Sequence, residues 1–116
     1  MEKRLGSIEI GGDVYPLNFS VRVSQAFNDL GAQKAESTYE IQKQNIQLLL
    51  LLLQDGAEYS RVILGKEISI PTLEQLELLL SPADNERVVQ AIRETMELGG
   101  MRLVQAKPKK KEGQKP

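Results

Sequence analysis

The chain has 116 residues, 41% of them hydrophobic, and a formal net charge of −1. This length suits a single hydrophobic core. Cysteine and histidine are both absent, which excludes disulfides, thiolate zinc sites and the Ser-His and Cys-His nucleophile pairs. We therefore expect a protein that is not an enzyme and that needs neither a metal nor a cofactor.

The apolar residues do not form a membrane-spanning segment. Their longest uninterrupted run is residues 48–53, far short of the roughly 20 residues that a transmembrane helix needs. The first residues carry charge, but no apolar stretch of the kind found in secretory signals follows them. We expect a soluble intracellular protein with no membrane partner.

Residues 5–19 have the pattern of a β-hairpin. Ile8 and Ile10 alternate with polar residues, and apolar residues resume after a break at positions 11–13. Gly11 and Gly12 can adopt the positive φ angles that tight hairpin turns require. Pro16 cannot donate to a strand ladder, so it places the second strand at an edge or at a bulge.

A short helix is predicted over residues 21–30, with Ser20 as its cap and Gly31 just past its end. The polar residues 32–36 then lead to the longest predicted helix, residues 37–54. Ser37 or Thr38 can cap this helix, and Glu40 suits its first turn. We expect it to stop at Gln54, Asp55 and Gly56.

The central helix over residues 37–54 is apolar around most of its circumference. At 100° per residue, one face gathers Tyr39, Ile46, Leu49, Leu50 and Leu53. A second apolar face contains Ile41, Leu48, Leu51 and Leu52. A helix of this kind is normally buried on more than one side.

Two interpretations of the second face remain open. The helix can be the centre of the core, covered on both sides by the rest of the chain. Alternatively, a chain this short covers only one side, and the second face binds a partner helix or another copy of the chain. On the second interpretation Ile41, Leu48, Leu51 and Leu52 are the candidate partner-binding residues, and they remain partly exposed in one chain.

The next two segments have less regular sequence patterns. Residues 57–64 favour another short helix closed by Gly65, although Val62 and Ile63 also permit a strand. Residues 66–70 alternate polar and apolar side chains, as in a short strand or an extended connector.

Two further helices have clear start signals. Thr72 and Gln75 match a capping box at the start of a helix that runs to Leu80. Ser81 then acts as a cap with Pro82 at the first helical position. The amphipathic helix that follows continues to Gly99 and Gly100.

These elements predict an α+β fold in which an N-terminal β-hairpin precedes four to five packed α-helices. We expect one globular domain over residues 1–104 and a disordered, Lys-rich tail over residues 105–116. Residues 102–116 carry six Lys or Arg and one Glu, so their net charge is +5 and that of residues 1–101 is −6.

The basic tail also raises the possibility of nucleic-acid binding. Four lysines within residues 107–111 can neutralise phosphates with an affinity that falls steeply with salt. The acidic body and the lack of interleaved aromatic residues instead favour a solvated tail. We expect no specific nucleic-acid partner.

The order of motifs resembles that of the tail assembly chaperones of bacteriophages and prophages with long, non-contractile tails. The strand pair over residues 8–20 is similar to their opening motif, and residues 48–56 match their Leu-rich helix with a Gly, here Gly56, soon after the leucines. Residues 72–80 and the Ser-Pro-Ala-Asp start at residues 81–84 complete the resemblance, which spans about residues 8–100.

The resemblance implies a function in assembly of the virion. Such proteins bind the long tape measure protein while the tail tube polymerises, act in the bacterial host cytoplasm and are absent from the finished virion. In many relatives a programmed frameshift yields a longer product that recruits the tail tube protein. The lysines at positions 109–111 are compatible with an A-rich slippery site in the message.

Two rival functions remain open at this point. The chain can be a small cytoplasmic adaptor or structural subunit that forms a homo-oligomer through its Leu-rich helix and has no phage role. It can also be a regulator that binds nucleic acid weakly through its tail.

Overall fold

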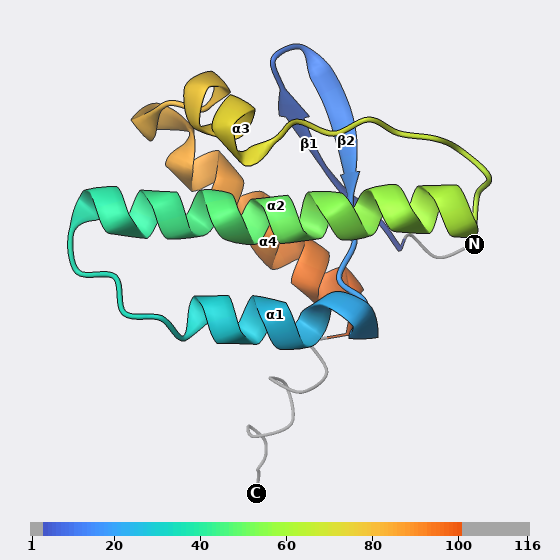
Figure 1. The fold of residues 1–116 in the computed structure, drawn as a ribbon, viewed down its shortest axis with the longest axis horizontal. Helices are drawn as coiled ribbons and strands as arrows, with labels where there is room; N and C mark the ends of the chain where they lie inside the picture. Colours follow the sequence, from blue (N-terminus) through green and yellow to red (C-terminus); the bar gives the residue numbers. More distant parts are fainter. Residues whose placement is uncertain (1–3, 101–116) are drawn as a thin grey trace, which may run out of the picture.

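The computed structural model describes residues 4–100, which form a two-stranded antiparallel hairpin followed by four α-helices and one 3₁₀ helix (Figure 1). This arrangement agrees with the predicted α+β order. The strands are β1 (Gly6–Ile10) and β2 (Asp13–Leu17), and the helices are α1 (Val21–Gly31), α2 (Thr38–Val62), α3 (Leu73–Leu79), η1 (Pro82–Asp84) and α4 (Asn85–Leu98).

The hairpin has the register that its alternation predicts. Ile10 pairs with Asp13 across a two-residue turn at Gly11 and Gly12, whose φ angles are +60° and +92°. Ile8 and Ile10 are buried, whereas Ser7 and Glu9 between them are exposed. The sheet has only two strands, so each strand has an unpaired edge. Strand β2 therefore tolerates Pro16, which has no backbone N–H to donate.

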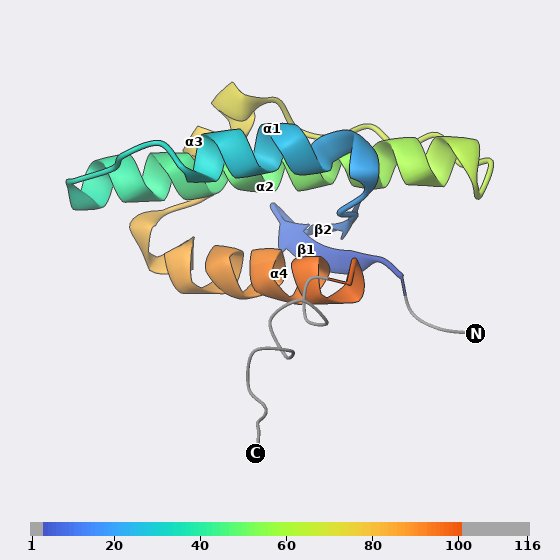
Figure 2. The same cartoon turned by 90° about the horizontal axis from the view of Figure 1, so that it is seen from below.

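The helices pack around the hairpin in layers. In Figure 2 the hairpin lies between α2 on one side and α4 on the other, with β1 against α4 and β2 against α2. Helix α1 runs beside α2, and α3 packs against α2 as well. The residues at the centre of the core come from both strands and from α2, α3 and α4; those with 0–2% exposure are Ile10, Leu17, Leu49, Leu52, Leu53, Leu76 and Val88.

The central helix is longer than predicted. It begins as expected, because the Ser37 hydroxyl accepts from the backbone N–H of Glu40 and the Glu40 carboxylate accepts from that of Ser37. It does not stop at residues 54–56 but continues to Val62. The separate helix predicted over residues 57–64 is therefore wrong; these residues extend α2.

Tertiary contacts explain why α2 passes through Asp55 and Gly56. Both residues are buried, and a Cβ on Gly56 would collide with the backbone carbonyl of Pro16 on β2. Glycine here permits close contact between helix and strand, at a cost of about 1 kcal/mol in helix propensity. The helix ends near Gly65, which has φ +69°, and the Lys66 N–H donates to the Ser60 carbonyl at 2.8 Å.

The remaining boundaries follow the predicted capping signals. Residues 66–70 form an extended connector without a strand. The Thr72 hydroxyl and the Gln75 side chain form the predicted capping box of α3. Ser81 precedes Pro82, and the first turn after it is the 3₁₀ helix η1, which leads into α4.

Two further sequence predictions concern the basic tail and membrane-spanning helices. The basic tail over residues 105–116 lies outside the described residues. Among residues 4–100, no helix is both long enough and apolar enough to cross a membrane.

Candidate functional site

Helix α1 covers much of the second face of α2, which the sequence offered as a partner-binding face. Two residues on that side of α2, Gln44 and Asp55, form hydrogen bonds near the two ends of α1. The Gln44 amide donates to the carbonyls of Leu30 and Gln33 at 2.9 and 2.8 Å, and Asp55 accepts from Ser20, the cap of α1. Leu48 and Leu51 lie between Gln44 and Asp55 on the same side, at spacings of four, seven and eleven residues from Gln44.

The four candidate residues therefore differ in exposure. Leu52 is completely buried, so the prediction that it lies on a partly covered surface is wrong. Leu48 and Leu51 are half-buried and pack against the core. Ile41 remains 42% exposed. The prediction for Leu52 assumed that only the hairpin and the C-terminal helices cover α2, on one side, and did not include α1, which also packs against α2.

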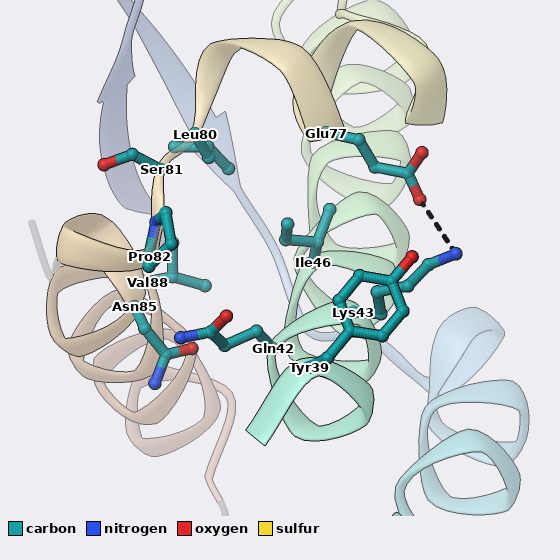
Figure 3. A pocket seen from close by; sticks show the side chains of 10 residues that line it. All are labelled: Tyr39, Gln42, Lys43, Ile46, Glu77, Leu80, Ser81, Pro82, Asn85 and Val88. Atoms are coloured by element: carbon teal, nitrogen blue, oxygen red, sulfur yellow. Dashed lines mark ion pairs between the residues drawn. The ribbon is translucent and has the colours of Figure 1, made fainter. Parts of the chain in front are cut away.

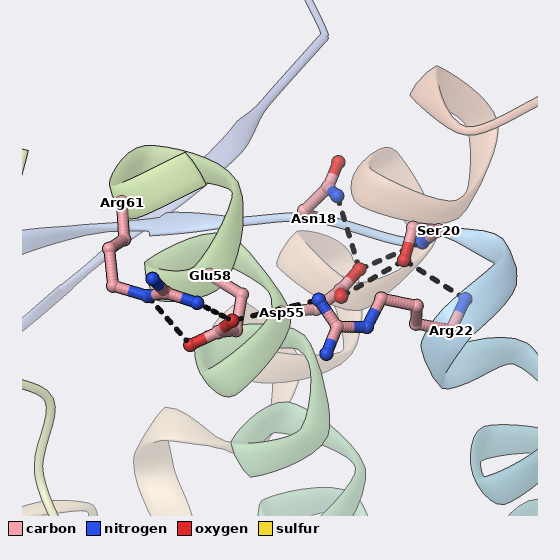
Figure 4. Close-up of polar contacts among 6 residues, drawn as sticks. All are labelled: Asn18, Ser20, Arg22, Asp55, Glu58 and Arg61. Atoms are coloured by element: carbon pink, nitrogen blue, oxygen red, sulfur yellow. Dashed lines mark hydrogen bonds and ion pairs between the residues drawn. The ribbon is translucent and has the colours of Figure 1, made fainter. Parts of the chain in front are cut away.

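The buried carboxylate of Asp55 joins three parts of the fold (Figure 4). One oxygen accepts from the Asn18 amide at 3.1 Å and from the Ser20 N–H at 2.9 Å, and the other accepts from the Ser20 hydroxyl at 2.9 Å. Asn18 in turn donates its backbone N–H to the Leu52 carbonyl. Every partner is a neutral donor within the fold, so the cluster is structural and fixes the β2–α1 link against α2.

On another side of α2, the structure contains an apolar groove between α2, α3 and α4 (Figure 3). Ile46 of α2 faces Leu80, which follows α3, and Val88 of α4; these three side chains form its floor. We call this feature the α2–α4 groove. Its complete lining is Tyr39, Gln42, Lys43, Ile46, Glu77, Leu80, Ser81, Pro82, Asn85 and Val88.

Polar groups form the rim of the α2–α4 groove. Lys43 Nζ lies 3.7 Å from a Glu77 carboxylate oxygen and 5.4 Å from the centre of the Tyr39 ring. The Tyr39 side chain, and then Glu77, raise the pKa of Lys43 above its usual value, so Lys43 is a cation at neutral pH. The Asn45 amide donates to Asn85, another residue of the groove lining, at 3.0 Å and links α2 to α4.

Exposed apolar side chains extend the surface beyond the groove. Tyr39 on its rim is 67% exposed. Leu78 and Leu79 belong to α3, the helix that supplies Glu77 to the rim, and they are 84% and 52% exposed. Leu79 also lies against the hairpin turn, because a Cβ on Gly11 would be 3.6 Å from it. The exposed surface of α3 therefore contains apolar side chains next to its polar ones.

The size of the α2–α4 groove indicates what it can bind. Its volume is about 270 Å³, just below the ~300–1,000 Å³ of typical small-molecule sites. It is open at the surface and has an apolar floor with polar edges, as expected of a site for one or two side chains of a partner helix. Among residues 4–100, no group of three or more acidic side chains is placed to hold a metal ion.

Sequence reasoning missed this groove. Tyr39 and Ile46 were assigned to the main core face of the central helix, and Leu80 and Val88 to the buried stripes of their own helices. Their periodicity predicts that all four side chains face inward, but Tyr39 is 67% exposed. The periodicity also does not show that α3 and α4 leave a gap between them.

Comparisons of the chain with protein-family models, with curated proteins and with solved structures find no match.

Proposed function

We propose that this chain is a non-enzymatic tail assembly chaperone of a bacteriophage or prophage with a long, non-contractile tail. It binds the tape measure protein in the bacterial host cytoplasm and supports assembly of the tail tube, without remaining in the mature virion. The motif order over residues 8–100 supports the family.

The main structural support for this proposal is the α2–α4 groove, which we take as the binding site. A tape measure protein is a long helical partner by the family resemblance, and an amphipathic helix binds by inserting its apolar side chains into a groove. The floor of Ile46, Leu80 and Val88 can accept such a side chain. Tyr39 on the rim supplies the exposed aromatic residue that is enriched among strong interface contacts.

The rim adds specificity to this contact. Lys43 and Glu77 are paired but partly exposed, with 41% and 35% of their side chains accessible. A polar group of the partner can bind either of them at the edge while apolar groups fill the floor, as in most protein interfaces. In this proposal, self-association through the same apolar surface competes with partner binding. The tail tube protein is recruited by a frameshifted longer form.

Co-expression tests the proposal directly. The gene for the candidate tape measure protein is expected beside this one, after a tail tube gene, and should encode a very long helical protein. The full chain should co-purify with this protein and increase its soluble fraction. If the tape measure protein is equally soluble without the chain and does not co-purify with it, the proposal is wrong.

A matched control makes the co-expression test specific. Leu78→Glu changes a side chain that is 84% exposed, so it should leave the fold intact while weakening capture if the α3 surface takes part. Ser24→Glu places the same charge on α1, away from the groove, and should leave capture unchanged. If the wild-type chain forms a homo-oligomer but does not bind the tape measure protein, the alternative function as an adaptor or structural subunit is favoured instead.

A further inference from the structure

One wall of the α2–α4 groove belongs to an acidic stretch of the chain. Residues 67–86 contain five acidic residues and no Lys or Arg, although the whole chain has 16 acidic and 15 basic residues. The five acidic residues are Glu67, Glu74, Glu77, Asp84 and Glu86. The last four of them lie in α3, in η1 and at the start of α4, the elements that form this wall of the groove.

The exposed side of α3 combines acidic side chains with an apolar one. Glu77 and Leu78 follow Glu74 by three and four residues, so the three side chains share one face of α3. Glu77 lines the groove and lies 3.7 Å from Lys43 (Figure 3), and Leu78 is 84% exposed. Acidic groups and an exposed leucine are therefore adjacent to the apolar floor of the groove.

Two carboxylates of this wall have no cation beside them in the described part of the chain. Glu74 and Glu86 are exposed, and neither forms an ion pair with a Lys or Arg among residues 4–100. Lys43 and Arg87 pair with the other two acidic residues of the wall. The wall therefore keeps a net negative charge at neutral pH.

The charge of the wall and the apolar floor together define the helix that fits this groove. The floor of Ile46, Leu80 and Val88 stabilises an apolar side chain of a partner. The negative wall attracts positive charge and repels negative charge, which favours one class of partner over another. On an amphipathic helix, Lys or Arg three or four residues from an apolar residue lies on the same side as that residue. A basic amphipathic helix satisfies both requirements.

We propose that the α2–α4 groove selects a basic amphipathic helix, in which Lys or Arg residues flank the apolar side chain that enters the floor. The flanking cations pair with Glu74 on α3 and Glu86 on α4, and a second apolar residue of the partner contacts Leu78. Given the proposed function, on which this use of the groove rests, the bound part of the tape measure protein is a basic segment. Residues 105–116 of the chain itself are basic but contain no large apolar residue for the floor.

Three synthetic helical peptides of about 20 residues test this selection with the full chain. The first repeats leucine at helical spacings and has Lys at the flanking positions. The second has Glu in place of each Lys, and the third keeps Lys but has Ala in place of each leucine. By fluorescence anisotropy in about 0.05 M NaCl, the first should bind at least about tenfold more tightly than either of the others. Equal binding of the first and second peptides, or of the first and third, would overturn the proposal.

Salt separates the charge contribution from the apolar one. Exposed charges interact over about 10 Å at about 0.1 M salt and over about 3 Å at about 1 M, whereas burial of a leucine in the floor does not depend on charge. The preference for the Lys peptide over the Glu peptide should therefore fall at least about threefold between about 0.05 M and about 0.5 M NaCl. A preference that stays constant over this range would contradict the pairing with Glu74 and Glu86.

A double variant locates the charge contact. Glu74→Gln combined with Glu86→Gln removes two exposed charges and should weaken binding of the Lys peptide about fivefold, as expected for two exposed ion pairs. It should leave binding of the Glu peptide no weaker. Asp29→Asn combined with Glu94→Gln is the matched control, because it removes the same charge at exposed positions of α1 and α4 outside the groove lining. Equal weakening by the two double variants would show that net charge alone attracts the peptide and would overturn the proposal.

Co-purification distinguishes a failure of this assignment from a failure of the proposed function. We expect the Glu74→Gln, Glu86→Gln double variant to capture less tape measure protein at low salt than the wild type does. If both capture it equally, the proposed function stands and the basic-helix assignment is wrong. If the three peptides bind as expected but the tape measure protein does not co-purify, the assignment stands and the proposed function is wrong.

Light scattering tests the other possible occupant of the groove, a second copy of the chain. An excess of the Lys peptide should dissociate any oligomer that uses the groove, because both compete for the same floor. An oligomer that the Glu74→Gln, Glu86→Gln double variant abolishes but that the Lys peptide leaves intact would show that the groove binds another copy, and would overturn the proposal.

Discussion

The Ser20 N–H and the Ser20 hydroxyl both donate to the carboxylate of Asp55, each at 2.9 Å. Ser20 is also the cap of α1, since its hydroxyl accepts from the Arg22 N–H at 3.2 Å. One residue of α2 thereby fixes the start of α1. This link, together with Gln44 near the other end of α1, holds α1 along the face of α2 that the sequence had suggested for a partner.

Asp55→Ala should lower the free energy of unfolding by about 2–4 kcal/mol, because it leaves the donors of Asn18 and Ser20 without a partner in a buried site. Chemical denaturation measures this loss. Glu58→Ala is the matched control one turn later on α2. Glu58 bridges Arg22 and Arg61 with a side chain that is 42% exposed, so its loss should leave stability nearly unchanged. Equal effects would contradict a structural role for Asp55.

Leu52→Ala should cost about 2–5 kcal/mol of stability, the usual range for truncating a fully buried leucine. Leu52→Glu should prevent folding, because it buries an unpaired charge. Gln54→Ala on the exposed side of α2 is the control and should change stability by no more than about 0.5 kcal/mol. A Leu52→Glu variant that melts like the wild type would restore the partner-face interpretation of this residue.

Gly56→Ala tests the close contact between α2 and β2. In a solvated helix interior this change stabilises by about 1 kcal/mol, but here the added Cβ meets the Pro16 carbonyl. The variant should therefore lose about 1–3 kcal/mol, as overpacked cores do. Gly31→Ala is the control, because no atom lies within 4 Å of its added Cβ. Gly31→Ala should be neutral or slightly stabilising.

The stability of the protein should depend on pH through Glu40. The backbone N–H groups of Glu36 and Ser37 lower the pKa of Glu40 below its ordinary value of 4.5. A carboxylate whose pKa is lowered by folding stabilises the folded state above the unfolded pKa, and this contribution is lost as the pH falls through the folded value. Glu40→Gln should therefore lower the melting temperature more at pH ~7 than at pH ~2. An equal difference at both pH values would contradict this account.

The sequence predicts the elements of this fold better than their packing. Alternation at Ile8 and Ile10 and the glycines of the turn define the hairpin, because both signals are local. The capping residues Ser20, Ser37 and Thr72 mark helix starts for the same reason. The predicted end of α2 was wrong because Asp55 and Gly56 resemble a local stop signal. In the fold, the Asp55 carboxylate accepts from Ser20, and Gly56 leaves room for the Pro16 carbonyl; both partners are distant in sequence.

The candidate site depends even more on distant contacts. The α2–α4 groove is lined by residues of α2, α3, α4 and the link between α3 and α4, and no periodicity within one helix reports how these elements lie relative to one another. The face containing Leu52 was assigned to a partner because helical spacing shows two apolar faces without showing that α1 covers one of them. Ile41 is the member of that set that stays clearly exposed.

Binding of the tape measure protein to two variants of α2 tests the central claim most directly. Tyr39 and Ile41 are both exposed, at 67% and 42%, and lie about 200° apart on the same helix. Tyr39→Glu and Ile41→Glu introduce the same charge, one at the α2–α4 groove and the other on the opposite side. We predict that Tyr39→Glu raises the Kd at least about tenfold, a loss of about 1.4 kcal/mol, while Ile41→Glu changes it less than about threefold. The reverse order, or no loss with Tyr39→Glu, would contradict the assignment of the groove as the binding site.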